Sequence, residues 1–250
     1  MTLSVALPIM IQNFITNFVS MLDNLMVGSL GTEQMSGVSI VNQLIFVFSL
    51  AIFGALSGAG IFTAQFFGKG DDEGIRYTVR FKMIISLLIF VVGTAVFLLF
   101  DTQLIGLFIH DVDPSCDLNA TIDFAESYLK VILWGLLPFT LSQAFSSTLR
   151  ETGETLAPML AGLAAVVTNC VFNYLLIFGK FGFPKLGVVG AAIATDISRY
   201  VECIIIIAYT FIKRGRFKYI NGAFRSAYIP RPVLKQITIK GMPLLLNEFL

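Results

Sequence analysis

The residue best suited to chemistry is an acid near the end of a strongly apolar stretch. Asp23 follows Pro8 by fifteen residues, which is about 22 Å along an α-helix. If that helix starts at the cytoplasmic face of a membrane, the carboxylate lies in the outward half, where insertion costs roughly 2.5 to 3.5 kcal/mol. Such an acid can exchange a proton, or coordinate sodium together with other oxygen ligands. The simpler alternative is that Asp23, four residues before the segment VGSLG, only reaches the outer interface.

Amides and a hydroxyl in other apolar stretches could accompany this acid. Asn169 and Asn173 are four residues apart and therefore share one face of a helix, and Thr195 lies in the next apolar stretch. Hydrogen bonding between helices is an equally good use for such side chains in a membrane. The same two interpretations, a cavity lining or contacts between helices, apply to Gln12, Asn13, Asn17, Asn42 and Gln43.

Three charged residues in the last apolar stretch form a separate group. Asp196, Arg199 and Glu202 are each three residues apart, so they stack along one side of a helix. Neighbours of opposite charge can neutralise one another there, and the spacing predicts structural ion pairs.

The elements that must position these groups are long apolar segments. Hydrophobic residues make up 56% of the 250, charged residues only 13%, and the mean hydropathy is +0.83, which excludes a water-soluble fold. A bilayer core about 30 Å thick needs about 20 apolar residues per helix, whereas membrane strands are about 10 residues long with alternating polarity. The sequence therefore predicts an all-α integral membrane protein with helices near residues 3–27, 37–67, 79–100, 124–149, 155–178 and 187–212.

Basic residues concentrate in alternate links between these helices. Thirteen of the 17 Lys and Arg follow the second, fourth and sixth helices, and only Lys180 and Lys185 lie in the other links. Because cytoplasmic loops carry the excess of Lys and Arg, we expect a multi-pass protein of the plasma (inner) membrane with a cytoplasmic N-terminus. Residues 213–240 are then a solvated basic linker attracted to membrane lipid, rather than a nucleic-acid-binding segment.

The sequence restarts after this linker. ALPIMIQNFI (6–15) and GMPLLLNEFL (241–250) align so that Pro8 matches Pro243 and Phe14 matches Phe249. An internal repeat at this distance is typical of a transporter with two halves. We therefore expect a six-helix N-terminal lobe at 1–212, a linker at 213–240 and the start of a seventh helix at 241–250. The seventh helix would begin a C-terminal lobe of the same protein, and that lobe would be the partner of the first.

Six segments resemble, in order, the multidrug and toxic compound extrusion (MATE) transporters. They are ALPIMIQNFI, VGSLGTEQMSGVSI, GIFTAQFFGKGD, LRETGETLAPML, NCVFNYLLIFG and GVVGAAIATDISR. The resemblance runs along the whole chain. It implies one half of a twelve-helix, two-lobed antiporter that exports organic cations and other amphiphilic small molecules by alternating access, driven by sodium or protons.

The resemblance also implies roles for individual residues. Asp23 is similar to the family's cation-coupling residue, and Asn169, Asn173 and Thr195 to positions that complete a site around it. Many relatives carry a second aspartate where this chain has Asn173. That departure weakens a proton relay and leaves a sodium site in which Asp23 is the carboxylate ligand.

Two alternatives to a drug exporter remain. A lipid-linked oligosaccharide flippase of the same superfamily needs positive residues in its cavity to hold a pyrophosphate, and the first two helices carry no Lys or Arg within their spans. A non-transporting receptor or scaffold fits the polar lining and the repeat less well. The sequence contains no GxSxG, HExxH or GxxxxGK[ST], so we expect no enzyme and no cofactor besides the coupling ion.

Overall fold

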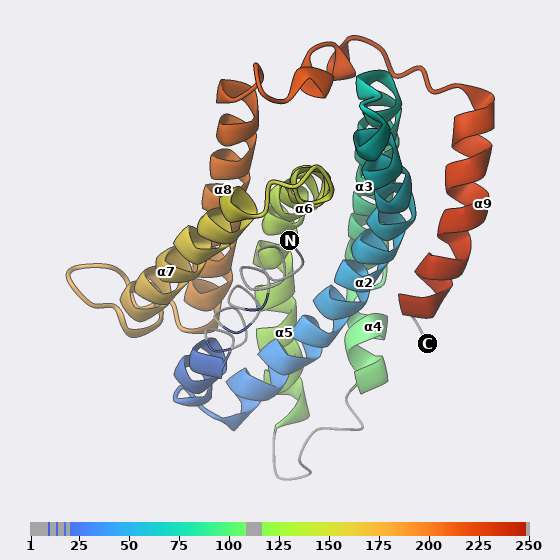
Figure 1. Cartoon of the computed structure of the whole chain (residues 1–250). Coiled ribbons are helices and arrows are strands. Elements are labelled where there is room, and N and C mark those ends of the chain that lie inside the picture. The colour runs from blue at the N-terminus through green and yellow to red at the C-terminus, as the bar shows by residue number, and fades with distance from the viewer. Residues whose placement is uncertain (1–9, 11–13, 15–17, 19–20, 109–116, 249–250) are drawn as a thin grey trace.

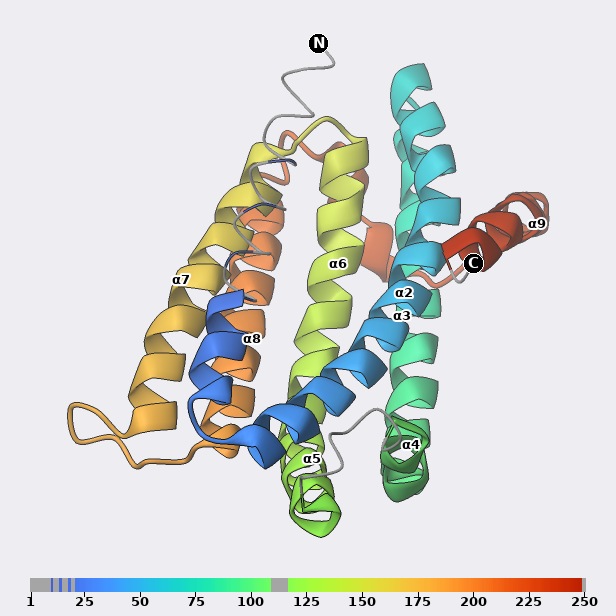
Figure 2. The same cartoon turned by 90° about the horizontal axis from the view of Figure 1, so that it is seen from below.

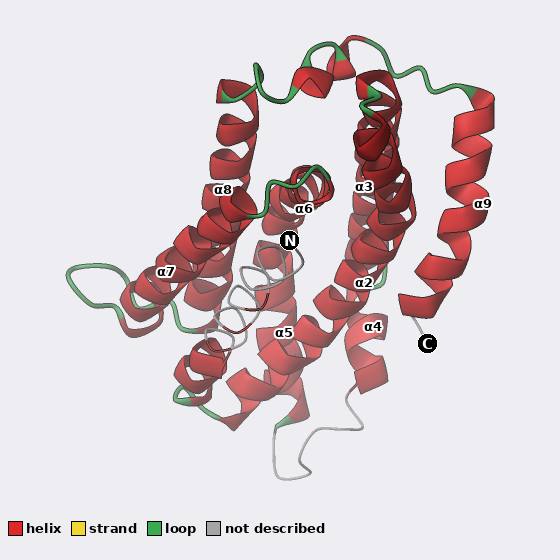
Figure 3. Cartoon of the chain, viewed as in Figure 1, coloured by secondary structure: helices red, strands yellow, loops and turns green. Residues whose placement is uncertain are grey.

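The computed structural model describes residues 10, 14, 18, 21–108 and 117–248. All regular elements in that part of the chain are helices (Figure 3). Residues 21–28 are helical and precede α2. The α-helices that follow are α2 (Thr32–Lys69), α3 (Asp72–Leu99), α4 (Asp101–Phe108), α5 (Leu118–Ile132), α6 (Leu136–Glu151), α7 (Leu156–Phe178), α8 (Val188–Ile212) and α9 (Arg231–Glu248).

These elements confirm the prediction of an all-α membrane protein. Within the described ranges, four helical stretches are long and apolar enough to cross a membrane: Thr32–Lys69, Asp72–Leu99, Leu118–Glu151 and Leu156–Phe178. The third stretch consists of α5 and α6, which a 3-10 turn at Leu133–Gly135 joins. Together they correspond to the single helix predicted at 124–149. α8 is 25 residues long and carries three charges in its central part.

The helices pack as two groups on either side of α6 (Figures 1 and 2). α7 and α8 lie side by side on one side, and α2, α3 and α9 lie on the other. The apolar core includes Ile52 of α2, Leu129 and Ile132 of α5, and Leu136 of α6, all nearly inaccessible. In contrast, α3 exposes Leu88, Val91, Val92, Leu98 and Leu99, as expected of a surface in contact with lipid.

Local sequence explains the turn between α2 and α3. Gly70 adopts a left-handed conformation (φ 70°) that ends α2, since glycine bears no Cβ to clash there. The Asp71 carboxylate then accepts a hydrogen bond from the Gly74 N–H at 2.9 Å and caps α3. α2 has 38 residues and is therefore about 57 Å long, so it extends well beyond a bilayer core.

The helix predicted to begin near residue 241 begins earlier, at Arg231. Pro232 is compatible with this start because it lies in the first turn of α9, where a helix needs no N–H donor. α9 crosses α2 where two glycines meet. A Cβ added at Gly58 would overlap the backbone of Gly241, so this contact depends on small residues.

The expectation of a solvated linker is wrong for four of the residues between 217 and 223. Phe217, Tyr219, Ile220 and Ala223 are buried, together with side chains of α3 and α6. Arg80 of α3 holds this segment by donating three hydrogen bonds to main-chain oxygens, those of Gly222 (2.9 Å), Ala223 (2.7 Å) and Tyr228 (2.8 Å). An irregular segment has carbonyl groups without helical partners, and a guanidinium can satisfy several of them together.

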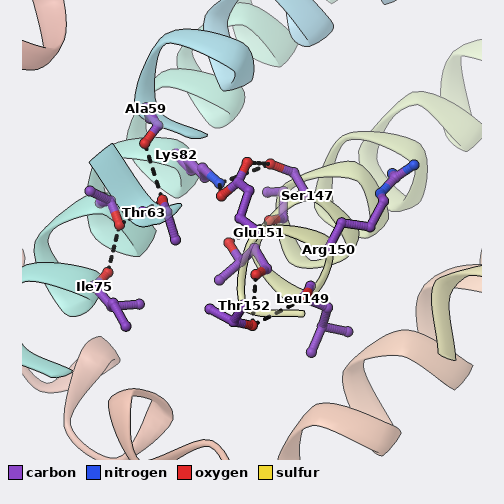
Figure 4. Close-up of polar contacts among 12 residues, drawn as sticks. Ala59, Thr63, Ile75, Lys82, Ser147, Leu149, Arg150, Glu151 and Thr152 are labelled. Carbon is purple, nitrogen blue, oxygen red and sulfur yellow. Dashed lines mark hydrogen bonds and ion pairs between the residues drawn. The ribbon is translucent and has the colours of Figure 1, made fainter. Parts of the chain in front are cut away.

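Lys82 is one of the thirteen basic residues assigned above to the alternate links, but it is completely buried within α3. Its ammonium group donates to the Ser147 hydroxyl at 2.8 Å and forms an ion pair with Glu151, both from α6 (Figure 4). The Ser147 hydroxyl in turn donates to Glu151 at 2.7 Å. We call Lys82, Ser147 and Glu151 the α3–α6 ion-pair cluster.

Candidate functional site

The four residues predicted to surround a coupling ion lie together in one hydrogen-bonded chain. The Asn173 amide donates to the Asp23 carboxylate at 2.6 Å and to the Asn169 side-chain oxygen at 3.0 Å. The Asn169 amide donates to the Thr195 hydroxyl at 3.2 Å. The structure thus brings together a carboxylate, two amides and a hydroxyl from three separate helical segments.

The helix geometry of α7 and α8 accounts for this arrangement. Asn169 and Asn173 lie one turn apart on the buried face of α7, with exposed fractions of 9% and 1%. That face packs against α8, which presents Thr195 seven residues after its start. Asp23 comes from the helical segment 21–28. The site therefore forms only when this segment, α7 and α8 place their polar side chains at the same level.

The site has oxygen atoms available for a small cation. The side-chain oxygen of Asn173 is buried and has no hydrogen-bond partner among the residues that the structure describes, and carbonyl and carboxylate oxygens are the donors that a hard cation prefers. No Lys or Arg in the described residues lies within 4.0 Å of the Asp23 carboxylate. Within the same part of the chain, no three His, Cys, Asp or Glu side chains group together as for a transition metal. Carboxylate and amide oxygens of this kind can coordinate a hard cation, and a carboxylate can also bind a proton.

A polar cavity of about 590 Å³ opens beside these residues. Asp23, Asn169 and Thr195 line it, as does Asn42 of α2, to which the Tyr128 hydroxyl donates at 3.5 Å. Gln43, also predicted to line a cavity, lies instead in a separate groove with Ser39 and Phe108. The three remaining predicted residues, Gln12, Asn13 and Asn17, lie outside the described residues.

The sequence interpretation missed the cationic residues of this cavity. Arg150 of α6 and Arg199 of α8 line it together with Glu202, so the absence of basic residues from the first two helices does not describe the whole cavity. The predicted ion pairs along α8 are wrong: in the described chain no carboxylate lies within 4.0 Å of Arg199. The sequence could have placed Arg199 and Glu202 in the cavity, because they follow Thr195 by four and seven residues and therefore share its helix face.

Long apolar helices that enclose a polar, ionisable cavity define the class of multi-pass membrane transport proteins. Comparison with known sequences identifies the family. The sequence model of the MatE family matches residues 8–175, more than half of the chain, and the protein belongs to this family.

Relatives of the chain are consistent with that assignment. It is 32% identical over 247 residues to a probable multidrug resistance protein NorM of Thermotoga maritima, covering 99% of this chain and 51% of that protein. A crystal structure of MATE in the bent conformation matches with a TM-score of 0.84 and 26% identity, over 99% of this chain and 52% of the other.

A second solved structure is a MOP-superfamily transporter of Pyrococcus furiosus, described as having a binding pocket of reverse polarity. It matches with a TM-score of 0.82 and 25% identity, over 98% of this chain and 51% of that one. The chain thus spans about half the length of the curated relatives and solved structures that it matches.

Proposed function

We propose that this chain forms the N-terminal lobe of a cation-coupled exporter of amphiphilic organic molecules, with Asp23 as the coupling residue. One observation carries the proposal: the Asp23 carboxylate is fixed by Asn173 at 2.6 Å and also lines the polar cavity. A single group can therefore respond to a coupling ion and to a cationic substrate. Relatives described as multidrug resistance proteins support this substrate class over a lipid-linked oligosaccharide.

The proposed coupling is a competition for the charge of one carboxylate. When Asp23 is ionised, the cavity attracts an organic cation. When Asp23 binds a proton or sodium, its charge is neutralised and the attraction is lost, so the substrate is released. Asn173, Asn169 and Thr195 would supply the further oxygen atoms that a sodium ion needs, whereas a proton needs none of them.

Transport by this route requires a second lobe, which we propose is the partner of this chain. Alternating access moves one half of a transporter against the other around a central site. α9 already packs against α2 and is the element that would begin that second lobe. In this arrangement the protein lies in the plasma membrane with the N-terminus and residues 213–230 on the cytoplasmic side.

The decisive experiment is efflux by the full-length protein carrying Asp23→Asn. We expect the variant to reach the membrane at normal level and to lose ion-driven efflux of a fluorescent organic cation. Asp123→Asn, which changes an exposed acid on α5, is the matched control and should transport normally. Unchanged drug resistance in cells expressing Asp23→Asn would contradict the assignment. In proteoliposomes, sodium and proton gradients imposed separately decide which ion is coupled.

A further inference from the structure

The cavity has a second polar end, built around two guanidinium groups. Thr195, Arg199 and Glu202 of α8 line the cavity, and so do Ser198 and, from α6, Arg150. Thr195 belongs to the Asp23 site. Because Glu202 follows it by seven residues, the two ends of the cavity are separated by about 10 Å along the axis of α8.

Arg199 is not neutralised by a direct partner. Its Nη1 atom is buried and makes no hydrogen bond within the described part of the chain. Asp196 is next to it in the predicted stack but lies against Gly135 of the 3-10 turn and does not line the cavity. Burying guanidinium donors without acceptors costs free energy, so this arrangement is suited to an acceptor that arrives from the cavity.

Arg150 faces the same space. Although it is next to Glu151 in sequence, its side chain points away from Glu151 and Lys82 (Figure 4). Among the described residues it makes two hydrogen bonds, both long, to the Ser146 carbonyl at 3.3 Å and to the Gln143 side-chain oxygen at 3.5 Å. Of the described residues at this end of the cavity, Glu202 alone carries a carboxylate, against two guanidinium groups.

Aromatic rings lie beside the guanidinium groups. Phe139 stacks under Arg199 at 5.3 Å from its ring centre, and Phe53 packs edge-on against Phe139 at 6.2 Å. Both rings line the cavity. The cavity wall therefore combines a carboxylate at one end, guanidinium groups at the other, and an apolar aromatic surface.

From this geometry we propose that Arg150 and Arg199 form an anion subsite that binds the carboxylate or other acid group of an amphoteric aromatic substrate. The inference rests on the proposed function and specifies its substrate class: molecules with a cationic group, an aromatic body and an acid group. A guanidinium suits this role because its fork of N–H donors matches both oxygens of a carboxylate. Asp23 at the opposite end meets the cationic group.

Two rhodamines that share one cationic ring system test the proposal, one with a free benzoate and one with the methyl ester. Their binding to the purified full-length protein is measured by fluorescence anisotropy without any ion gradient, so the result does not depend on coupling. We expect Arg199→Gln and Arg150→Gln each to weaken binding of the free acid at least tenfold and to change binding of the ester less than twofold. Arg199→Lys, which keeps the charge but loses the fork, should give an intermediate loss.

Arg214→Gln is the matched control, because Arg214 is an exposed arginine at the end of α8, outside the cavity. It should bind both probes as the unmodified protein does. Equal weakening of both rhodamines by Arg199→Gln would overturn the proposal, since it would show that the arginine only maintains the fold. Unchanged binding of the free acid in both arginine variants would overturn it too. Failure of the coupling assignment is recognised separately, by efflux in Asp23→Asn.

Discussion

Arg150 and Glu151 are consecutive residues, but they belong to two polar regions of very different character. Glu151 faces α3, where the α3–α6 ion-pair cluster satisfies its charge with Lys82 and Ser147. The Arg150 side chain points away from Glu151 (Figure 4) and lines the cavity, and no carboxylate of the described residues lies within 4.0 Å of it. Successive residues of a helix point about 100° apart, so one helix can serve both regions.

The difference separates groups that hold the fold from groups left available for a ligand. A buried charge with a close partner loses much free energy when that partner is removed. A charge that faces a polar cavity is not tied to one protein partner, so its removal should affect ligand binding more than folding. The predictions that follow test this division in order of decreasing effect.

The largest effect should come from breaking the ion-pair cluster. Lys82→Met leaves Glu151 without its cation between α3 and α6, and we expect a loss of about 3–5 kcal/mol in the free energy of unfolding. Denaturant titration in detergent measures it. Adding Glu151→Leu removes the orphaned carboxylate and should recover most of the loss. A double variant as unstable as the single one would show that the pair itself supplies net stability.

A smaller loss should follow from releasing residues 217–228. Arg80→Ala removes three charge-assisted hydrogen bonds to main-chain oxygens, each part of the docking of this segment. These bonds are exposed or only partly buried and hold one surface segment, so we expect that segment to open locally while the helices stay folded. Limited proteolysis should cut within the segment at least tenfold faster. Arg231→Ala changes an exposed arginine at the start of α9 and should not alter the cutting rate.

On the cavity side, Asn173→Ala should change ion dependence more than stability. The variant loses the donor that fixes Asp23 and a buried side-chain oxygen. We expect the concentration of coupling ion needed for half-maximal efflux to rise about tenfold, equivalent to about 1.4 kcal/mol. Asn173→Asp, which adds an acid, should retain efflux and respond more strongly to a proton gradient. Loss of unfolding stability comparable to that of Lys82→Met would erase the distinction between the two regions.

The smallest effect concerns Tyr219 in the docked segment. Burial raises the pKa of Tyr219 from 10.0 to about 12, although a hydrogen bond with Thr152 lowers it in part. Since the folded pKa is the higher one, the neutral phenol stabilises docking below about pH 10, and this contribution is lost as pH rises towards 12. The difference in tyrosinate absorbance between unmodified protein and Tyr219→Phe measures it. A titration centred near pH 10 would show that the ring is solvated.

The sequence was sufficient for the class of fold and for the Asp23 neighbours, for identifiable physical reasons. Apolar length sets the spans, and the i, i+4 spacing of Asn169 and Asn173 places both on one face. It was insufficient where partners are distant in sequence. Lys82 and Arg80 look in the sequence like residues of a basic link. Their partners become visible only in the fold, where α3 packs on α6 and on residues 217–228. The local spacing of Asp196, Arg199 and Glu202 predicts ion pairs, but Asp196 lies against Gly135 and Arg199 stacks on Phe139.

The docked segment also bears on how α2 and α9 come together during folding. Gly58 and Gly241 touch although most of the chain separates them, and the entropic cost of closing such a loop grows with the logarithm of its length. Once Arg80 has captured Ala223 beside α3, only a short loop remains between that point and Gly241. The Arg80 contact therefore shortens the free chain that precedes α9. A shorter free chain raises the effective concentration of α9 beside α2.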